Sequence, residues 1–104
     1  MRRVSTITAR KETILELGDA FIVLPGGVGT LDEFFFVLAR ARMGLHEKPC
    51  GILNTLNYYS SLLRFLDHMI AEEFLRTKHL SLFVEENPDV LLTTLLRTID
   101  VAVE

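Results

Sequence analysis

Residues 22–36, IVLPGGVGTLDEFFF, decide the fold of this 104-residue chain. The apolar run at 20–24 contains β-branched residues and ends at a proline, which is typical of a short strand buried on both faces. Three glycines between 26 and 29 then form a turn, and residues 31–43 predict a helix that Gly44 ends. This order of strand, glycine-rich turn and helix is typical of an α/β protein.

The rest of the chain continues the alternation of strands and helices. Helical spacing at 8–17 precedes the first strand, and residues 50–54 predict a second buried strand. A long helix is expected at about 57–72, a third strand within 80–86, and a last helix from Pro88 onward. The sequence therefore predicts an α/β fold, with a Rossmann-like parallel sheet and flanking helices.

Such a sheet is small for its class. Two or three parallel strands with helices do not bury both faces and both edges of a sheet. We therefore expect residues 1–104 to form a single but partial α/β domain that lacks its N-terminal half. The remainder is expected either upstream in a longer parent protein or from another chain.

Composition excludes several classes of function. The chain is 49% hydrophobic and 24% charged, which suits a packed domain, and its formal net charge is −3. This mild acidity argues against nucleic acid as a partner, because a nucleic-acid binder normally presents a basic face. No apolar stretch approaches the roughly 18 residues of a membrane helix, and the first residues lack the apolar region of a secretory signal. We expect no membrane association and a cytoplasmic location.

The cysteine and histidines predict no metal or redox chemistry. The single cysteine, Cys50, excludes an internal disulfide and suits a reducing compartment. It lies in an apolar run, so a buried, inert thiol is favoured over a nucleophile. The histidines at 46, 68 and 79 show no metal-ligand spacing, and we interpret them as surface or loop residues.

The glycine-rich turn predicts a phosphate site. It lies where the carboxyl end of a strand meets the start of a helix, and free N–H groups and the helix dipole favour an anion there. It is not a Walker A loop, because Gly29 is followed by Thr30 without a lysine. It is not a dinucleotide fingerprint either, because Asp32 stands where the third glycine would be. What remains is P-G-G-x-G-T-x-x-E, a phosphate loop with a carboxylate nearby.

The motif P-G-G-x-G-T-x-x-E allows two interpretations of Glu33. Thr30 and Glu33 match a capping box, in which Thr30 is the N-cap and Glu33 returns a hydrogen bond to it. The alternative is a functional carboxylate beside the phosphate, since a cap does not need three glycines in front of it. The pair Arg10 and Lys11 likewise reads either as a solvated helix face or as part of the site.

The motif LPGGVGTLDEFF, with Arg10 and Lys11 upstream, resembles the LOG family of cytokinin riboside 5′-monophosphate phosphoribohydrolases. The family's signatures are P-G-G-x-G-T-x-x-E and an upstream M-x-x-R-K, and the likeness runs over residues 7–95. The downstream stretches GLHEKPCGILN and YYSSLLRFLDHMIAEEFL also resemble the family. Family members are often labelled lysine decarboxylases in error. The lysines of this chain show no arrangement suited to a pyridoxal cofactor.

The resemblance implies an N-glycosidase. Such an enzyme hydrolyses the glycosidic bond of an adenosine 5′-monophosphate derivative, AMP or N6-prenylated AMP, without a cofactor or metal. By position, Arg10 and Glu33 are the expected catalytic pair. A carboxylate suits this role because the transition state is positive at the anomeric carbon. The expected substrate-binding residues are Arg10, Lys11, Gly26, Gly27, Val28, Gly29, Thr30, Leu31, Asp32 and Glu33.

The resemblance also has departures, and it implies a partner. Ile7 stands where the family usually has methionine, and Ala39 stands where many members carry a polar residue. Three successive phenylalanines at 34–36 cover most of the circumference of their helix, so we expect it to be buried nearly all round. A homodimer explains this burial, as in the family, and packing against a missing half is the alternative.

Three functional hypotheses therefore follow from the sequence. The first is the nucleoside 5′-monophosphate glycosidase. The second is a non-catalytic nucleotide-binding module that keeps the glycine loop. The third is an inactive, truncated fragment, which would expose strand edges and dissolve poorly.

Overall fold

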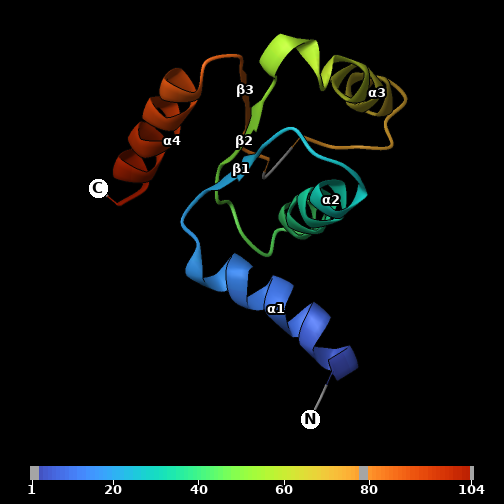
Figure 1. Cartoon of the computed structure of the whole chain (residues 1–104), viewed down its shortest axis with the longest axis vertical. Coiled ribbons are helices and arrows are strands. Elements are labelled where there is room, and N and C mark those ends of the chain that lie inside the picture. Colours follow the sequence, from blue (N-terminus) through green and yellow to red (C-terminus); the bar gives the residue numbers. More distant parts are fainter. Residues whose placement is uncertain (1–2, 78–79, 104) are drawn as a thin grey trace.

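The computed structural model describes the backbone of residues 3–77 and 80–103 and the side chains of residues 10–77 and 80–99. A three-stranded sheet lies between α4 on one side and α2 with α3 on the other (Figure 1). The predicted α/β class is therefore confirmed. The elements in chain order are α1 (Arg3–Leu17), β1 (Phe21–Val23), α2 (Val28–Arg42), β2 (Cys50–Leu53), the 3₁₀ helix η1 (Thr55–Asn57), α3 (Ser60–Ala71), β3 (Leu82–Glu85) and α4 (Pro88–Val103).

The sheet has the order β1-β2-β3, and both strand pairs are parallel. The central strand β2 pairs on both edges, with Cys50 opposite Phe21 on one side and Leu82 on the other. All four of its residues are buried. A strand that is covered on both faces reads as a continuous apolar run, which is why its position was predicted so closely.

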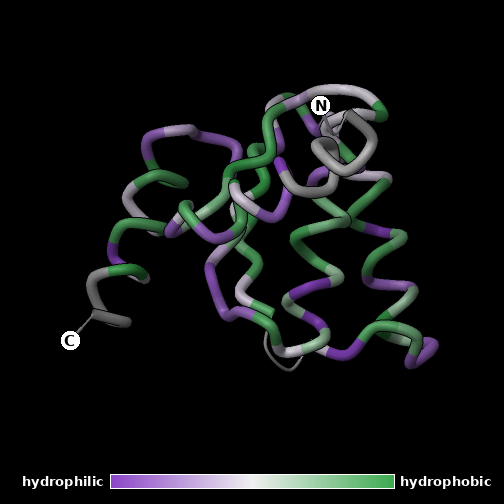
Figure 2. The backbone as a smooth tube through the Cα atoms, turned by 90° about the horizontal axis from the view of Figure 1, so that it is seen from below, coloured by the Kyte–Doolittle hydropathy of each residue, from purple (hydrophilic) through white to green (hydrophobic). Residues whose placement is uncertain are grey.

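Alternate residues of β2 face the two helical layers. Ile52, which is fully buried, packs with Cys50 against residues of α2 and α3. Leu53 faces the opposite layer and packs against α4. On the same face a Cβ at Gly51 would lie 2.5 Å from Leu91, so the glycine lets α4 approach the sheet closely. Hydrophobic and hydrophilic stretches alternate along the helical coils (Figure 2).

The strand β1 is less buried than predicted. It covers three residues, and Ile22 and Leu24 are exposed, so the expectation of burial on both faces is wrong. The reason is that β1 is an edge strand and α4 lies mainly over β2 and β3. No residue in the described ranges pairs with the outer edge of β1.

The helix α2 is also only partly buried. Phe34 is 3% exposed and lies in the core, whereas Phe35 is 37% exposed and Phe36 is half-buried near α1. The expectation that this helix is buried nearly all round is therefore wrong for the described residues. Successive helical residues point about 100° apart, so three phenylalanines cannot share one covered face.

The C-terminal end of α2 and the start of α4 are set by local features of the sequence. Gly44 has a φ of 76°, and its N–H and that of Leu45 bond back to Ala41 and Arg40, which confirms the predicted stop. At the start of α4, the side chain of Asn87 accepts hydrogen bonds from the N–H groups of two residues in the first turn.

Within the described ranges, no helix has the length and hydrophobicity that a membrane crossing requires.

Candidate functional site

The glycine loop follows the carboxyl end of β1 and leads directly into α2. Gly27 is the N-cap residue, and its carbonyl accepts the first helical hydrogen bond from Leu31, at 3.1 Å. No side chain caps this helix end. Thr30 lies inside the first turn, three residues later than a capping box requires, so the capping interpretation of Glu33 is wrong. The first N–H groups of α2 are left for an anion or for solvent.

The three glycines of the loop have different reasons to be glycine. A Cβ at Gly26 would lie 2.3 Å from the hydroxyl of Thr30, so packing within the loop excludes a side chain there. A Cβ at Gly27 or Gly29 would meet no atom within 4 Å. Their lack of side chains therefore leaves space in front of the helix rather than relieving a clash.

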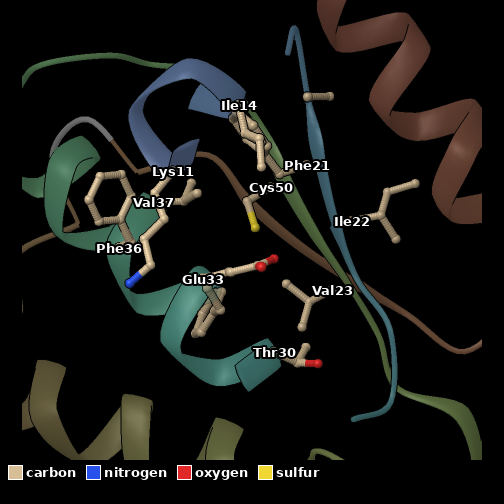
Figure 3. A pocket seen from close by; sticks show the side chains of 12 residues that line it. Lys11, Ile14, Phe21, Ile22, Val23, Thr30, Glu33, Phe36, Val37 and Cys50 are labelled. Carbon is tan, nitrogen blue, oxygen red and sulfur yellow. The ribbon is translucent and has the colours of Figure 1, made fainter. Parts of the chain in front are cut away.

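A cavity of about 260 Å³ opens beside this loop, between α1, α2 and β1. Its wall is mostly apolar, and Glu33 extends from α2 into it toward β1 (Figure 3). Among the described residues, Glu33 has no ion pair or hydrogen-bond partner. The cavity is lined by Lys11, Ile14, Ala20, Phe21, Ile22, Val23, Thr30, Glu33, Phe34, Phe36, Val37 and Cys50.

Charged contacts fasten α1 to α2 beside the cavity. Lys11 Nζ lies 2.5 Å from a carboxylate oxygen of Asp32 and 5.6 Å from the centre of the Phe36 ring. Arg40 lies over the same ring at 4.2 Å and makes an ion pair of 3.7 Å with Glu12. Two cations from neighbouring helices therefore flank one aromatic ring, and Lys11 and Asp32 neutralise each other.

The structure brings only some of the predicted site residues together. Lys11, Thr30 and Glu33 line the same cavity. Arg10 is exposed on α1, does not line the cavity, and has no partner within the described part of the chain. Of the remaining loop positions, Val28 is open to solvent, whereas Leu31 is half-buried and packs against the core.

Two tyrosines that the sequence reasoning did not assign contact the glycine loop. Tyr58 donates a hydrogen bond of 2.5 Å to the carbonyl of Gly26, and Tyr59 donates one of 2.5 Å to the carbonyl of Leu24. They lie 32 and 35 residues from their acceptors. Their only signal in the sequence was the pair of tyrosines shortly after the second predicted strand.

Cys50 and His46 have structural roles. Burial raises the pKa of the Cys50 thiol to about 12, so it stays protonated at neutral pH although it touches the cavity. The predicted burial of this thiol is confirmed. His46 lies in the loop before β2, where its ring bonds to the carbonyl of Val37 and to the N–H of Lys48. Residues 10–77 and 80–99 contain no cluster of three side chains suited to a metal; His79 lies outside the described residues.

Both lysines in the described part of the chain, Lys11 and Lys48, have polar partners. Lys11 is paired with Asp32, and the ammonium of Lys48 donates to the carbonyls of Leu15 and Glu16 at the end of α1. Lys78 lies outside the described residues. A cation that bonds the last carbonyls of a helix stabilises its end, which is a structural task.

Comparison with known proteins agrees with the motifs. A family model described as "Possible lysine decarboxylase" matches residues 1–95. A cytokinin riboside 5′-monophosphate phosphoribohydrolase of Rhodococcoides fascians is 54% identical over 66 residues, which are 64% of this chain and 33% of that protein. An enzyme of the same name from Arabidopsis thaliana is 46% identical over 77 residues, 74% of this chain and 36% of that protein.

The chain thus spans about a third of the length of each of these two relatives. The range that the family model matches contains Arg10, Lys11, the glycine loop and Glu33. On this evidence, the chain belongs to the LOG family, which carries the lysine decarboxylase description.

Proposed function

We propose that this chain carries the phosphate loop and catalytic carboxylate of an N-glycosidase that acts on nucleoside 5′-monophosphates. The substrate is AMP or an N6-substituted AMP, and the products are the free base and ribose 5-phosphate. The base is a cytokinin when N6 is prenylated. The observation that carries this proposal is the carboxylate of Glu33, which has no partner among the described residues and reaches into an apolar cavity beside an uncapped helix N-terminus.

The 5′-phosphate binds in front of α2. The N–H groups of Val28, Gly29 and Thr30 have no acceptor in the preceding turn, and the helix dipole favours negative charge there. The open space at Gly27 and Gly29 allows the phosphate oxygens to approach the backbone. The name of each relative includes a 5′-monophosphate, which is the group this loop would bind.

Glu33 acts on the glycosidic bond. Water attacks the anomeric carbon as the bond to the base nitrogen breaks, and positive charge develops on the sugar in the transition state. The carboxylate stabilises this charge and accepts a proton from the attacking water, while the departing base takes up a proton. The apolar wall contributed by Phe21, Val23 and Val37 suits the flat face of a purine and strengthens electrostatic effects near it.

Arg10 and Lys11 are the two cations of α1 next to the site, and Arg10 supplies the positive charge. Lys11 is already at the cavity wall, where Asp32 neutralises it. Arg10 is the neighbouring cation without a partner among the described residues, and its guanidinium suits a phosphate or a pair of ribose hydroxyls. Its long side chain turns toward the loop when the nucleotide binds.

We also propose a homodimer and a cytoplasmic location. The support for the dimer is the exposure of large apolar side chains, among them Val28 at the start of α2 and Phe35 within it. Light scattering of the purified chain checks this: twice the mass of the 11.8 kDa chain is expected. The support for the cytoplasm is the buried free thiol of Cys50, since reduced cysteines are usual there.

Base release tests the proposed function. The purified chain is incubated with AMP and with N6-isopentenyl-AMP, and the free base and ribose 5-phosphate are measured by chromatography. Release of both products in equal amounts is expected. If the folded chain binds AMP in calorimetry but releases no base, the non-catalytic binding module is the better description. If it neither binds nor cleaves, the proposal fails for this chain.

A further inference from the structure

The two tyrosines at the start of α3 lie against the glycine loop from a distant part of the sequence. Tyr58 is largely exposed and Tyr59 is buried, and their rings meet edge to face with centres 4.9 Å apart. Each hydroxyl donates to a backbone carbonyl at the end of β1, that of Gly26 and that of Leu24. The turn before α3 and the loop before α2 lie at the same end of the sheet (Figure 1).

The bond from Tyr58 fixes the orientation of one peptide group. In a trans peptide the carbonyl oxygen of Gly26 and the N–H of Gly27 point in opposite directions. Because the carbonyl points to Tyr58, the N–H of Gly27 points away from it. No described residue accepts from that N–H, and the space around Gly27 is open.

The bond from Tyr59 fixes the strand end that precedes the loop. Its ring belongs to the main core cluster, and burial raises the pKa of its hydroxyl, so the hydroxyl stays a donor. The N–H of Tyr59 bonds to the side-chain oxygen of Asn54 at 2.6 Å. Asn54 is the buried polar side chain of the described core, and its own N–H bonds to Glu85 of β3. One chain of hydrogen bonds thus links β3, β2 and the end of β1.

The turn that delivers the tyrosines is strained. Leu56 and Asn57 have φ values of 51° and 61°, in the left-handed region. For leucine this conformation is unfavourable, and such strain persists only where surrounding contacts hold it.

We propose that Tyr58 and Tyr59 are positioning residues that orient the glycine loop for its anionic ligand. The inference rests on the proposed function for the identity of that ligand, a nucleoside 5′-monophosphate. The tyrosines do not touch the reacting atoms. Tyr58 holds the carbonyl of Gly26 so that the N–H of Gly27 remains directed at the phosphate, and Tyr59 holds the carbonyl of Leu24, from which the loop starts.

The test uses Tyr58→Phe and Tyr59→Phe, which keep the rings and remove only the hydroxyls. Ser61→Ala is the matched control, because it removes a hydroxyl that bonds to Arg64 on the outer surface of α3. Amide hydrogen exchange is followed across the whole chain, and AMP binding is measured by calorimetry. Inorganic phosphate serves as the second probe.

Both tyrosine variants are expected to speed exchange of the Leu31 amide, whose N–H bonds to the carbonyl of Gly27 in the loop, while leaving α4 unchanged. AMP and phosphate binding should weaken by roughly 2- to 13-fold, the range that a lost hydrogen bond implies. Ser61→Ala should change neither quantity. In Tyr58→Phe the melting temperature is expected to stay near that of the parent, since its side chain is largely exposed.

Two outcomes would overturn the proposal. The first is unchanged exchange of the Leu31 amide, and the second is faster exchange spread evenly over all elements, which would indicate general destabilisation. If the parent chain binds no nucleotide, the proposed function fails, but the exchange of the Leu31 amide still decides whether the tyrosines position the loop.

Discussion

The two helices that carry the proposed catalytic pair are held in different ways. Glu33 belongs to α2, where Phe34, Leu38 and Ala41 are buried in the core. Arg10 belongs to α1, in which none of the residues 10–17 is buried. The helix α1 is instead fastened by exposed ion pairs, by the ring of Phe36 between two cations, and by Lys48.

This difference matters because the two kinds of contact respond to different conditions. Apolar packing is insensitive to salt, whereas exposed ion pairs contribute about 0–1 kcal/mol each and are screened. We therefore expect the position of Glu33 to be rigid and that of Arg10 to be adjustable. A cation that closes over a bound phosphate from a loosely held helix is consistent with this arrangement.

The largest expected effect comes from Glu33→Gln in α2, the helix that is packed in the core. Base release should fall by roughly 10²- to 10⁴-fold, because the carboxylate no longer stabilises charge or accepts a proton. Thermal stability should hardly change, since Glu33 has no partner in the described part of the chain. Turnover and melting temperature are measured on the same sample. Unchanged turnover would contradict the catalytic assignment.

Gly29→Ala separates ligand binding from stability within the same helix. Alanine favours the helix by roughly 0.5–1 kcal/mol over glycine, and its Cβ meets no other atom, so the free energy of unfolding should rise. AMP affinity should fall roughly tenfold, because the methyl group occupies the phosphate site. Gly26→Ala is the contrasting variant: its Cβ meets Thr30, and a loss of roughly 1–3 kcal/mol of stability is expected. Equal AMP affinity in Gly29→Ala and the parent would contradict the placement of the phosphate beside Gly29.

Phe36→Leu is expected to weaken the attachment of α1, the helix that carries Arg10, to α2. The substitution keeps an apolar side chain but removes the ring that lies between Lys11 and Arg40, at a cost of roughly 1 kcal/mol. Hydrogen exchange in α1 should become faster while α2 is unaffected, and KM for AMP should rise roughly fivefold with a smaller change in kcat. Phe35→Leu is the control, because its ring contacts Phe34 rather than α1. An identical response of both variants would show that α1 does not depend on the cation contacts.

Leu56→Gly is expected to have the smallest effect. Leucine at a φ of 51° costs roughly 1–2 kcal/mol, and glycine relieves this but adds freedom to the unfolded chain. A net gain of about 0.5–1 kcal/mol in unfolding free energy is therefore expected in urea denaturation. Asn57→Gly should gain less, since asparagine tolerates the left-handed region. A loss of stability in Leu56→Gly would mean that the leucine side chain makes a contribution its exposure does not suggest.

Much of the fold was predictable because it depends on local patterns. Three features act within a few residues of the chain: the apolar run that forms β2, the glycine that ends α2 and the proline that begins α4. All three were predicted at or near their observed positions. The start of α2 was not, because a threonine and a glutamate three residues apart match a capping box that the helix does not use.

The candidate site divides in the same way. The glycine loop, Lys11 and Glu33 were identified from motifs, and the structure places Lys11 and Glu33 at one cavity. The tyrosine contacts to the loop could not be identified, because no local rule joins residues more than 30 positions apart. The exposure of Phe35 was also missed, since the hydrophobicity of a residue does not say which face of its helix is covered.

The order of strands and helices, the glycine-loop motif and the family could all be inferred without the structure, because periodicity, turn residues and motif spacing are local properties. Only the tertiary structure decided that Glu33 is not a cap, that Lys11 and Lys48 are engaged, and that two tyrosines hold the loop. The physical reason is that these facts depend on which groups meet through space. The hydrogen bonds and ion pairs concerned exist only once the sheet has brought distant segments together.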